Sequence, residues 1–215
     1  MKPLRVVALL DGAIVLPSGA LALDGLLAAA VAIRDNLPPP TISVANGGLV
    51  PIEIPVQREP KGRFHLASWA RPRFDHHETR YRNRRFPVVE ALALSTIKRI
   101  DTNAGPEKSY RIPHAASHVE GDTLEWWCVG DEDGARALCA LIHGVGKHRN
   151  VGRGRVREWI VEPCEPWGDG FPVVRDGTPM RPLPLDWPGV TSGAHAYAVL
   201  TYPFWERTRE ELCVV

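Results

Sequence analysis

A glycine- and arginine-rich stretch, residues 144–157, constrains the fold of this chain more than any other segment. It reads GVGKHRNVGRGRVR and holds four glycines, one lysine and four arginines. Glycine allows backbone conformations and close approaches that a Cβ forbids, while lysine and arginine supply charge and phosphate-matching donors. Residues 135–142 before it are predicted as a helix, and residues 155–161 as a strand. We therefore expect a basic loop that joins a helix to a strand and suits a polyanion.

Two nucleotide-binding motifs do not fit this stretch. A P-loop needs a glycine five positions before its Gly-Lys pair and Ser or Thr after it, but Leu141 and His148 stand there. A dinucleotide-binding turn follows a strand and opens a helix, whereas here the order is reversed and Arg149 replaces the third glycine. The remaining alternative to a polyanion-binding loop is a flexible basic connector.

Composition places the chain among soluble globular proteins, because 44% of its 215 residues are hydrophobic and 24% are charged. The net charge is only +1, so attraction to nucleic acid must come from the distribution of charge. Residues 61–99 hold ten basic against three acidic residues, and residues 143–159 five against one. Residues 100–140 reverse this, with eight acidic against three basic. These local imbalances predict a basic face beside an acidic one.

No membrane segment, metal site or cofactor is expected. The four cysteines are widely separated and form no Cys-x-x-Cys pair, which favours reduced, buried thiols. Residues 21–33 are too short an apolar run to span a bilayer, so we expect a cytoplasmic protein. His76-His77 and the pair His114 and His118 lack a nearby cysteine or a carboxylate at the usual spacing for a metal.

The coarse order of the chain is strand, helix, strand pair, insertion, helix, strand. This predicts an α+β fold with the βαββαβ order of the ferredoxin-like frame, which RNA recognition motifs also use. We expect one domain over residues 1–162, with a basic insertion at about 71–109, and a Pro/Trp-rich extension over 163–215 that packs on it. The predicted segments are a central strand at 4–10, a helix at 21–34, a hairpin of 50–56 with 63–69, a short apolar segment at 88–100, a hairpin of 110–119 with 123–129, and a tail strand at 195–201.

The segment from Arg71 to Phe86 is polar and interleaves arginines with Phe74, Tyr81 and Phe86. Guanidinium groups bind phosphates and aromatic rings stack on bases, so this composition is typical of a surface that holds single-stranded nucleic acid. We interpret it as an excursion from the core. The alternative is a solvated charged loop.

A glycine loop that follows the second helix of a ferredoxin-like frame resembles that of the RAMP superfamily of CRISPR-associated RNA-binding proteins. The similarity rests on Gly144, Gly146, Lys147, Gly152, Gly154 and Val156. Residues 21–30, LALDGLLAAA, are similar to the start of a subgroup of that superfamily. Within it, the chain resembles the small subunit that caps the 5′ end of the guide RNA in type IV effector complexes.

This resemblance implies a non-enzymatic, RNA-binding subunit that holds the repeat-derived 5′ handle of the guide RNA. Its partners would be the repeating backbone subunit and a large subunit near target DNA, with target sequence read by base pairing. A projecting thumb would divide the handle from the guide, and residues 71–86 are the candidate. Handle contacts are expected at Gly144, Gly146, Lys147, His148, Arg149, Gly152, Arg153, Gly154 and Arg155, and thumb contacts at Arg80, Tyr81, Arg82, Arg84 and Arg85.

The rival hypothesis is a metal-independent endoribonuclease that processes repeat RNA. Such cleavage needs a base for a 2′-hydroxyl, usually histidine. Processing enzymes of the superfamily often carry it near the first helix, but the first histidine here is His65. Tyr81, Lys147 and either His143 or His148 form an alternative set. We expect no enzyme activity; a third class, a scaffold that never touches RNA, would assemble equally well on guides without a handle.

Overall fold

The apolar segment near the amino terminus forms the middle strand of the main sheet. In the computed structural model of the chain, β1 (Lys2–Leu10) pairs antiparallel with β6 (Thr123–Gly130) on one side and with β7 (Val156–Pro163) on the other. Neighbours on both edges satisfy its backbone, and a run of apolar side chains suits burial on both faces. The predicted central strand at residues 4–10 is confirmed.

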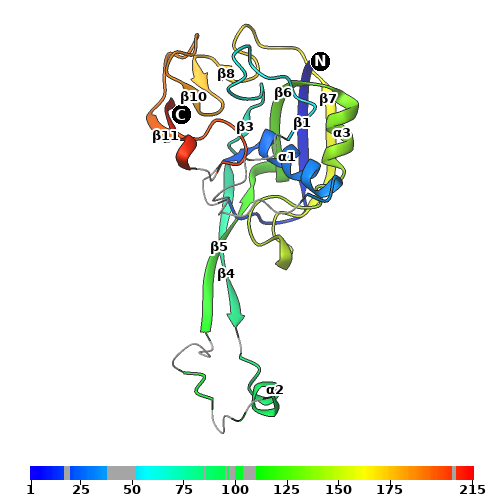
Figure 1. Cartoon of the computed structure of the whole chain (residues 1–215), viewed down its shortest axis with the longest axis vertical. Coiled ribbons are helices and arrows are strands. Elements are labelled where there is room, and N and C mark those ends of the chain that lie inside the picture. The colour runs from blue at the N-terminus through cyan, green and yellow to red at the C-terminus, as the bar shows by residue number, and fades with distance from the viewer. Residues whose placement is uncertain are drawn as a thin grey trace.

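The fold mixes sheets with few helices and belongs to the α+β class (Figure 1). The structure describes residues 1–16, 20–37, 52–84, 86–94, 96, 100–103, 110–204 and 207–215, and at 80, 82–84, 110–112, 114 and 207 it describes the backbone only.

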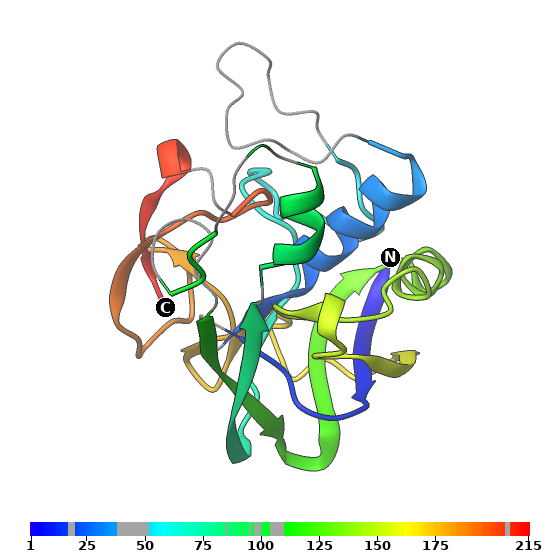
Figure 2. The same ribbon diagram turned by 90° about the horizontal axis from the view of Figure 1, so that it is seen from below.

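Two helices cover one face of the sheet, as Figures 1 and 2 show. In α1 (Leu23–Arg34), the buried Leu23, Leu27 and Val31 recur every four residues and form its apolar stripe. In α3 (Glu132–Cys139), the carboxylate of the N-cap residue Asp131 accepts the backbone N–H of Gly134 at 2.7 Å. Both helices were predicted: the acidic residues at 131–133 open α3 as their preference for a helix amino terminus indicates, and α3 ends at Cys139, three residues before the expected end at 142.

The core lies between these helices and the sheet. Alternate residues of β1 and β6 point toward the helices and are buried, including Leu4, Val6 and Trp126. The indole N–H of Trp126 donates to the carbonyl of Leu21 at 2.8 Å, so the largest buried side chain of the core has a partner. Neither of these two helices lies on the opposite face of the sheet (Figure 1).

The predicted hairpin of residues 50–56 with 63–69 is wrong, because these segments do not form two regular paired strands in the described residues. Residues 50 and 51 lie outside the described residues, and the rest form isolated bridges: Arg58 with His65, Val56 with Gly130 and Ala67 with Cys128. Pro55 has no N–H to give to a ladder, which breaks the pairing. The segment nevertheless runs beside β6, and β3 (Trp69–Ala70) then pairs with β2 (Leu21–Ala22).

A long two-stranded ribbon projects from the core (Figure 1). β4 (Phe74–Arg84) pairs antiparallel with β5 (Tyr110–Val119), and α2 (Val88–Ala93) lies at the far end. The predicted hairpin of residues 110–119 with 123–129 is therefore wrong. At Gly121 and Asp122 the chain takes left-handed φ angles of 66° and 52°, and the next strand, β6, pairs with β1. The insertion predicted at about 71–109 thus omitted its own return strand.

The tail forms a second small apolar cluster beside the core. β10 (Leu183–Pro184), β12 (Glu211–Val214) and β11 (His195–Ala198) form one sheet, and β8 (Val174–Arg175) pairs with β9 (Thr178–Pro179). Phe64, Val173 and Leu200 are buried together there. The predicted strand at 195–201 is confirmed over its first four residues.

Among the described helices, none has the length and apolarity that a bilayer crossing requires. All four cysteines are free thiols. Burial raises the pKa of the Cys128 and Cys139 thiols to about 12, so both are neutral and inert at neutral pH. Within the described part of the chain, no three His, Cys, Asp or Glu side chains gather as a metal site would require.

Candidate nucleic-acid interface

The glycine-rich stretch forms a loop whose base is fastened to the chain that leaves β1. The N–H of Lys147 donates to the carbonyl of Val15 at 2.9 Å, and that of Gly154 to Ala13 at 3.0 Å. The two arms of the loop also bond to each other, with the N–H of Val145 donating to Gly154 at 2.8 Å. The loop joins α3 to β7 as expected, but these bonds show an anchored structure instead of a flexible connector.

Two glycines are required by the close packing of this base. Gly146 has φ of 79°, and a Cβ there would lie 2.6 Å from the carbonyl oxygen of Val15. Gly154 has φ of 60°, and a Cβ there would lie 1.9 Å from the carbonyl oxygen of Val145. Both distances are well inside van der Waals contact, so these positions exclude side chains. The glycines therefore fix the shape of the loop.

The tip of the loop presents its cations to solvent. Lys147 and Arg149 are exposed on either side of His148, which has a left-handed φ of 61° and leads into a short 3-10 helix (Arg149–Val151). Lys147 has no side-chain hydrogen bond or ion pair to any described residue. Arg155 is 71% exposed, and its only ion pair within the described residues is a loose one with Asp11 at 3.8 Å. A surface pair of this kind contributes little, about 0–1 kcal/mol, so a phosphate can replace Asp11.

Arg153 behaves differently from its neighbours. Its guanidinium donates to the carboxylate of Glu78 on β4 at 3.0 Å, and the two side chains are only 15% and 18% exposed. His118 of β5 lies 4.0 Å from the same carboxylate. The pair therefore ties the glycine loop to the foot of the projecting ribbon. Arg153 was predicted as a phosphate contact, which stays a prediction, but in this structure its charge is already bound.

A groove of about 540 Å³ runs between the loop and α1. Leu26 and Ile33 of α1 contribute an apolar wall, while Arg149, Asn150 and Arg155 contribute a polar one. Ile33 is 61% exposed, so its side chain is accessible on this wall. One wall can contact ribose or base, and the other can contact phosphate.

The predicted thumb residues occupy the outgoing strand of the ribbon. Arg80, Arg82 and Arg84 stand at alternate positions of β4, opposite His114, Ile112 and Tyr110 of β5. Tyr81 lies between them and is 49% exposed. Arg85 lies outside the described residues, as do the side chains of the other three arginines. The ribbon places these residues away from the glycine loop (Figure 1).

The candidate nuclease residues lie on different elements. His143 is exposed where the loop begins, and its carbonyl accepts the N–H of Val156 at 3.0 Å. His148 is half-buried at the tip, and Tyr81 is on β4.

Sequence reasoning missed Glu78 and the α1 wall of the groove. A single glutamate within a run of arginines was the available sign of an internal ion pair. The exposed Ile33 gave no sign, because an apolar residue on a helix is normally assigned to the core.

The comparisons with known proteins place this arrangement in a family. No curated protein matches the chain. A family model described as CRISPR type IV associated protein Csf3 matches residues 73–215, which include the ribbon, β6, α3, the glycine loop, β7 and the tail. Because that match covers well over half of the chain, the protein belongs to the Csf3 family of CRISPR type IV associated proteins.

Proposed function

We propose that this chain is a non-catalytic subunit of a type IV CRISPR effector complex and binds the 5′ handle of the guide RNA at the glycine loop. The observation that carries the proposal is the anchored loop with exposed Lys147, Arg149 and Arg155 beside a half-apolar groove. A rigid backbone with outward cations binds a sugar-phosphate chain at low entropic cost. Membership of the Csf3 family supplies the CRISPR context.

We further propose that the core is ferredoxin-like, as in RAMP proteins. The antiparallel order β6-β1-β7 and the packing of α1 beside α3 on one face support this frame. The bridged segment at residues 52–70 lies beside β6, where the frame places its second strand. In a regular ferredoxin-like sheet this segment would be a continuous strand, whereas here Pro55 helps to break it into isolated bridges.

The projecting ribbon supports the assignment of a thumb. Its basic strand, β4, leaves the core next to the glycine loop, to which Arg153 and Glu78 connect it. A ribbon held in this way would separate handle nucleotides from guide nucleotides. The repeating backbone subunit, the large subunit and target DNA are the partners we propose around it, in a cytoplasmic complex.

Binding of labelled handle RNA at several salt concentrations tests the handle proposal. Replacing Arg149 and Arg155 with alanine should weaken binding and reduce the slope of log K against log salt by about 0.7 for each phosphate that the protein no longer neutralises. The matched control is Arg58→Ala with Lys61→Ala, which removes the same charge from an exposed turn outside the groove. Equal slopes for both variants would contradict the handle assignment.

The endoribonuclease alternative has a separate test. Purified protein incubated with labelled repeat RNA without metal should leave it intact. Cleavage that is abolished by His143→Ala or His148→Ala would contradict the non-catalytic assignment.

A further inference from the structure

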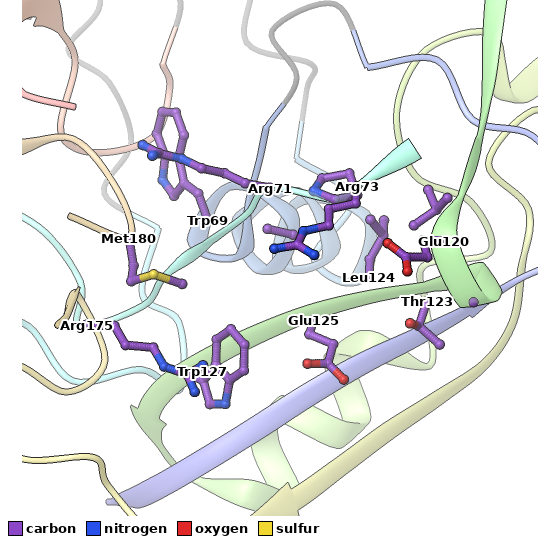
Figure 3. A pocket seen from close by; sticks show the side chains of 14 residues that line it. Trp69, Arg71, Arg73, Glu120, Thr123, Leu124, Glu125, Trp127, Arg175 and Met180 are labelled. Carbon is purple, nitrogen blue, oxygen red and sulfur yellow. The ribbon is translucent and has the colours of Figure 1, made fainter. Parts of the chain in front are cut away.

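The face of the main sheet opposite α1 and α3 carries a second pocket, of about 720 Å³, at the foot of the ribbon. It lies between β3, β6 and the junctions where the chain enters β4 and leaves β5 (Figure 3). Strand alternation places Glu125 and Trp127 of β6 on this face, away from the helices. The volume is within the range of small-molecule and cofactor sites, about 300–1,000 Å³. This pocket is distinct from the groove at the glycine loop.

Arginines surround an aromatic floor in this pocket. Figure 3 shows Arg73 reaching in from the ribbon side and Arg175 from the tail side, with Trp127 on the strand below them. The guanidinium of Arg175 lies 5.8 Å from the Trp127 ring centroid and 5.1 Å from that of Trp167. Cation and ring are thus already combined at one end of the pocket.

The charge balance of the lining favours an anion. Arg71, Arg73 and Arg175 oppose two carboxylates, and one of these, Glu125, is bonded to Arg5 of β1. Arg5 also bridges to Glu162 at 2.8 Å, which raises the pKa of its guanidinium further and keeps it charged. Arg71 and Arg73 are exposed, and neither side chain has a hydrogen bond or ion pair to a described residue. Their charges are therefore available.

A polar atom in the wall also has no partner. The indole N–H of Trp69 is buried and finds no acceptor among the described residues. A buried donor without an acceptor costs about 1–3 kcal/mol, which native structures usually avoid.

We propose that this pocket binds a nucleotide of a single-stranded nucleic acid, with its base against Trp127 and its phosphates at Arg71 and Arg73. Stacking on an aromatic ring with guanidinium contacts to phosphate is the combination that holds single strands. The inference goes beyond handle binding, because it needs no handle sequence and uses none of the glycine-loop residues. An acidic peptide is the competing occupant, but it has no ring to stack on Trp127.

The test uses the purified full chain with short labelled oligouridine and oligothymidine. Arg71→Ala with Arg73→Ala should weaken binding and lower the salt slope by about 1.4, that is, about 0.7 for each of two phosphates. Trp127→Leu should weaken binding roughly 5- to 150-fold, as expected when one base can no longer stack. Arg58→Ala with Lys61→Ala is again the charge-matched control. If the pocket variants lose only oligouridine binding, the bound strand is the guide RNA. If they lose only oligothymidine binding, it is the target DNA strand. Loss of both would show that the pocket does not distinguish ribose from deoxyribose.

A second measurement does not depend on variants that fold. Ultraviolet crosslinking of oligo(4-thiouridine) to the wild-type chain should label the peptides that carry Trp69 and Trp127. Salt slopes for the pocket variant that equal the control, or label confined to other peptides, would overturn the proposal, as would tighter binding of an acidic peptide than of either oligonucleotide. If the glycine-loop variants lose handle RNA while the pocket variants bind normally, only this inference fails.

Discussion

The guanidinium of Arg181 in the tail donates a hydrogen bond to the carboxylate of Asp24 in α1 across 3.2 Å, and both side chains are buried. Arg181 also donates to the carbonyls of His65, at 2.7 Å, Ala67, at 3.1 Å, and Leu200. One cation therefore joins the first helix, the segment beside β6 and the tail. The extension is tied to the core by a buried charge as well as by apolar contact.

Removal of either member of this pair should destabilise the protein strongly. Asp24→Asn and Arg181→Met should each lower the free energy of unfolding by about 3–5 kcal/mol, because each leaves a buried charge without its partner. Urea denaturation measures both. The double variant should cost less than the sum of the two, and strict additivity would show that the two residues are not coupled.

Stability should fall in mildly acidic solution because of His65. Burial, followed by the nearby Arg58 and Arg181, lowers the pKa of this histidine from 6.5 to about 4. The unfolded chain therefore binds a proton first as pH falls, so stability is full above about pH 6.5 and declines toward pH 4. The whole decline amounts to roughly 3 kcal/mol.

Urea denaturation at a series of pH values checks this decline. The matched variant is His65→Leu, which removes the titrating ring and whose stability should change less between pH 6.5 and pH 4. An identical pH dependence in the two proteins would assign the effect to other groups.

The two glycines at the end of the loop should respond differently to alanine. Gly154→Ala places a Cβ against the carbonyl of Val145, so it should displace the loop base and weaken handle RNA binding. Gly152→Ala has a comparable left-handed φ of 82° but no atom within 4 Å of the new Cβ, so it should cost only the backbone strain, about 1–2 kcal/mol. Thermal unfolding and handle RNA binding are measured for both variants. Equal losses of stability and of RNA affinity in the two variants would argue against close packing at Gly154.

Arg153 should contribute to the position of the ribbon more than to RNA charge contacts. Arg153→Ala should lower the salt slope of handle binding less than Arg155→Ala, because its charge is bonded to Glu78. Hydrogen exchange at the foot of β4 should rise, since the ribbon loses its tie to the loop. The charge-swapped double variant, Arg153→Glu with Glu78→Arg, should restore the protection of these β4 amides from hydrogen exchange. A slope change as large as that of Arg155→Ala would show direct phosphate contact.

Local patterns predicted the parts of the fold that local chemistry determines. The apolar run at 4–10, the stripe of α1 and the glycine loop between α3 and β7 all follow from periodicity or from glycine. The strand β5 was also predicted, but its pairing with β4 was not, because two alternating segments around Glu120, Gly121 and Asp122 have the same pattern as a hairpin. Its true partner, β4, is polar and showed no strand periodicity.

In the candidate site, too, the sequence indicated local features but not contacts between distant residues. Exposed cations of the loop follow from composition, but the bond of Arg153 to Glu78 joins residues far apart in sequence and needed the tertiary structure. The pocket at the foot of the ribbon combines Arg71, Trp127 and Arg175 from three distant segments, so no spacing in the sequence could indicate it.

The middle strand of the main sheet, β1, lies outside the region that matches the family model. The Csf3 family match begins at residue 73, so it includes both β6 and β7 but not the strand that hydrogen-bonds to each of them. A fragment cut at that boundary would hold two edge strands with an open gap between them and would also lack Asp24, the counter-ion of Arg181. The matched region thus lacks the middle strand of its own sheet, which residues 2–10 supply.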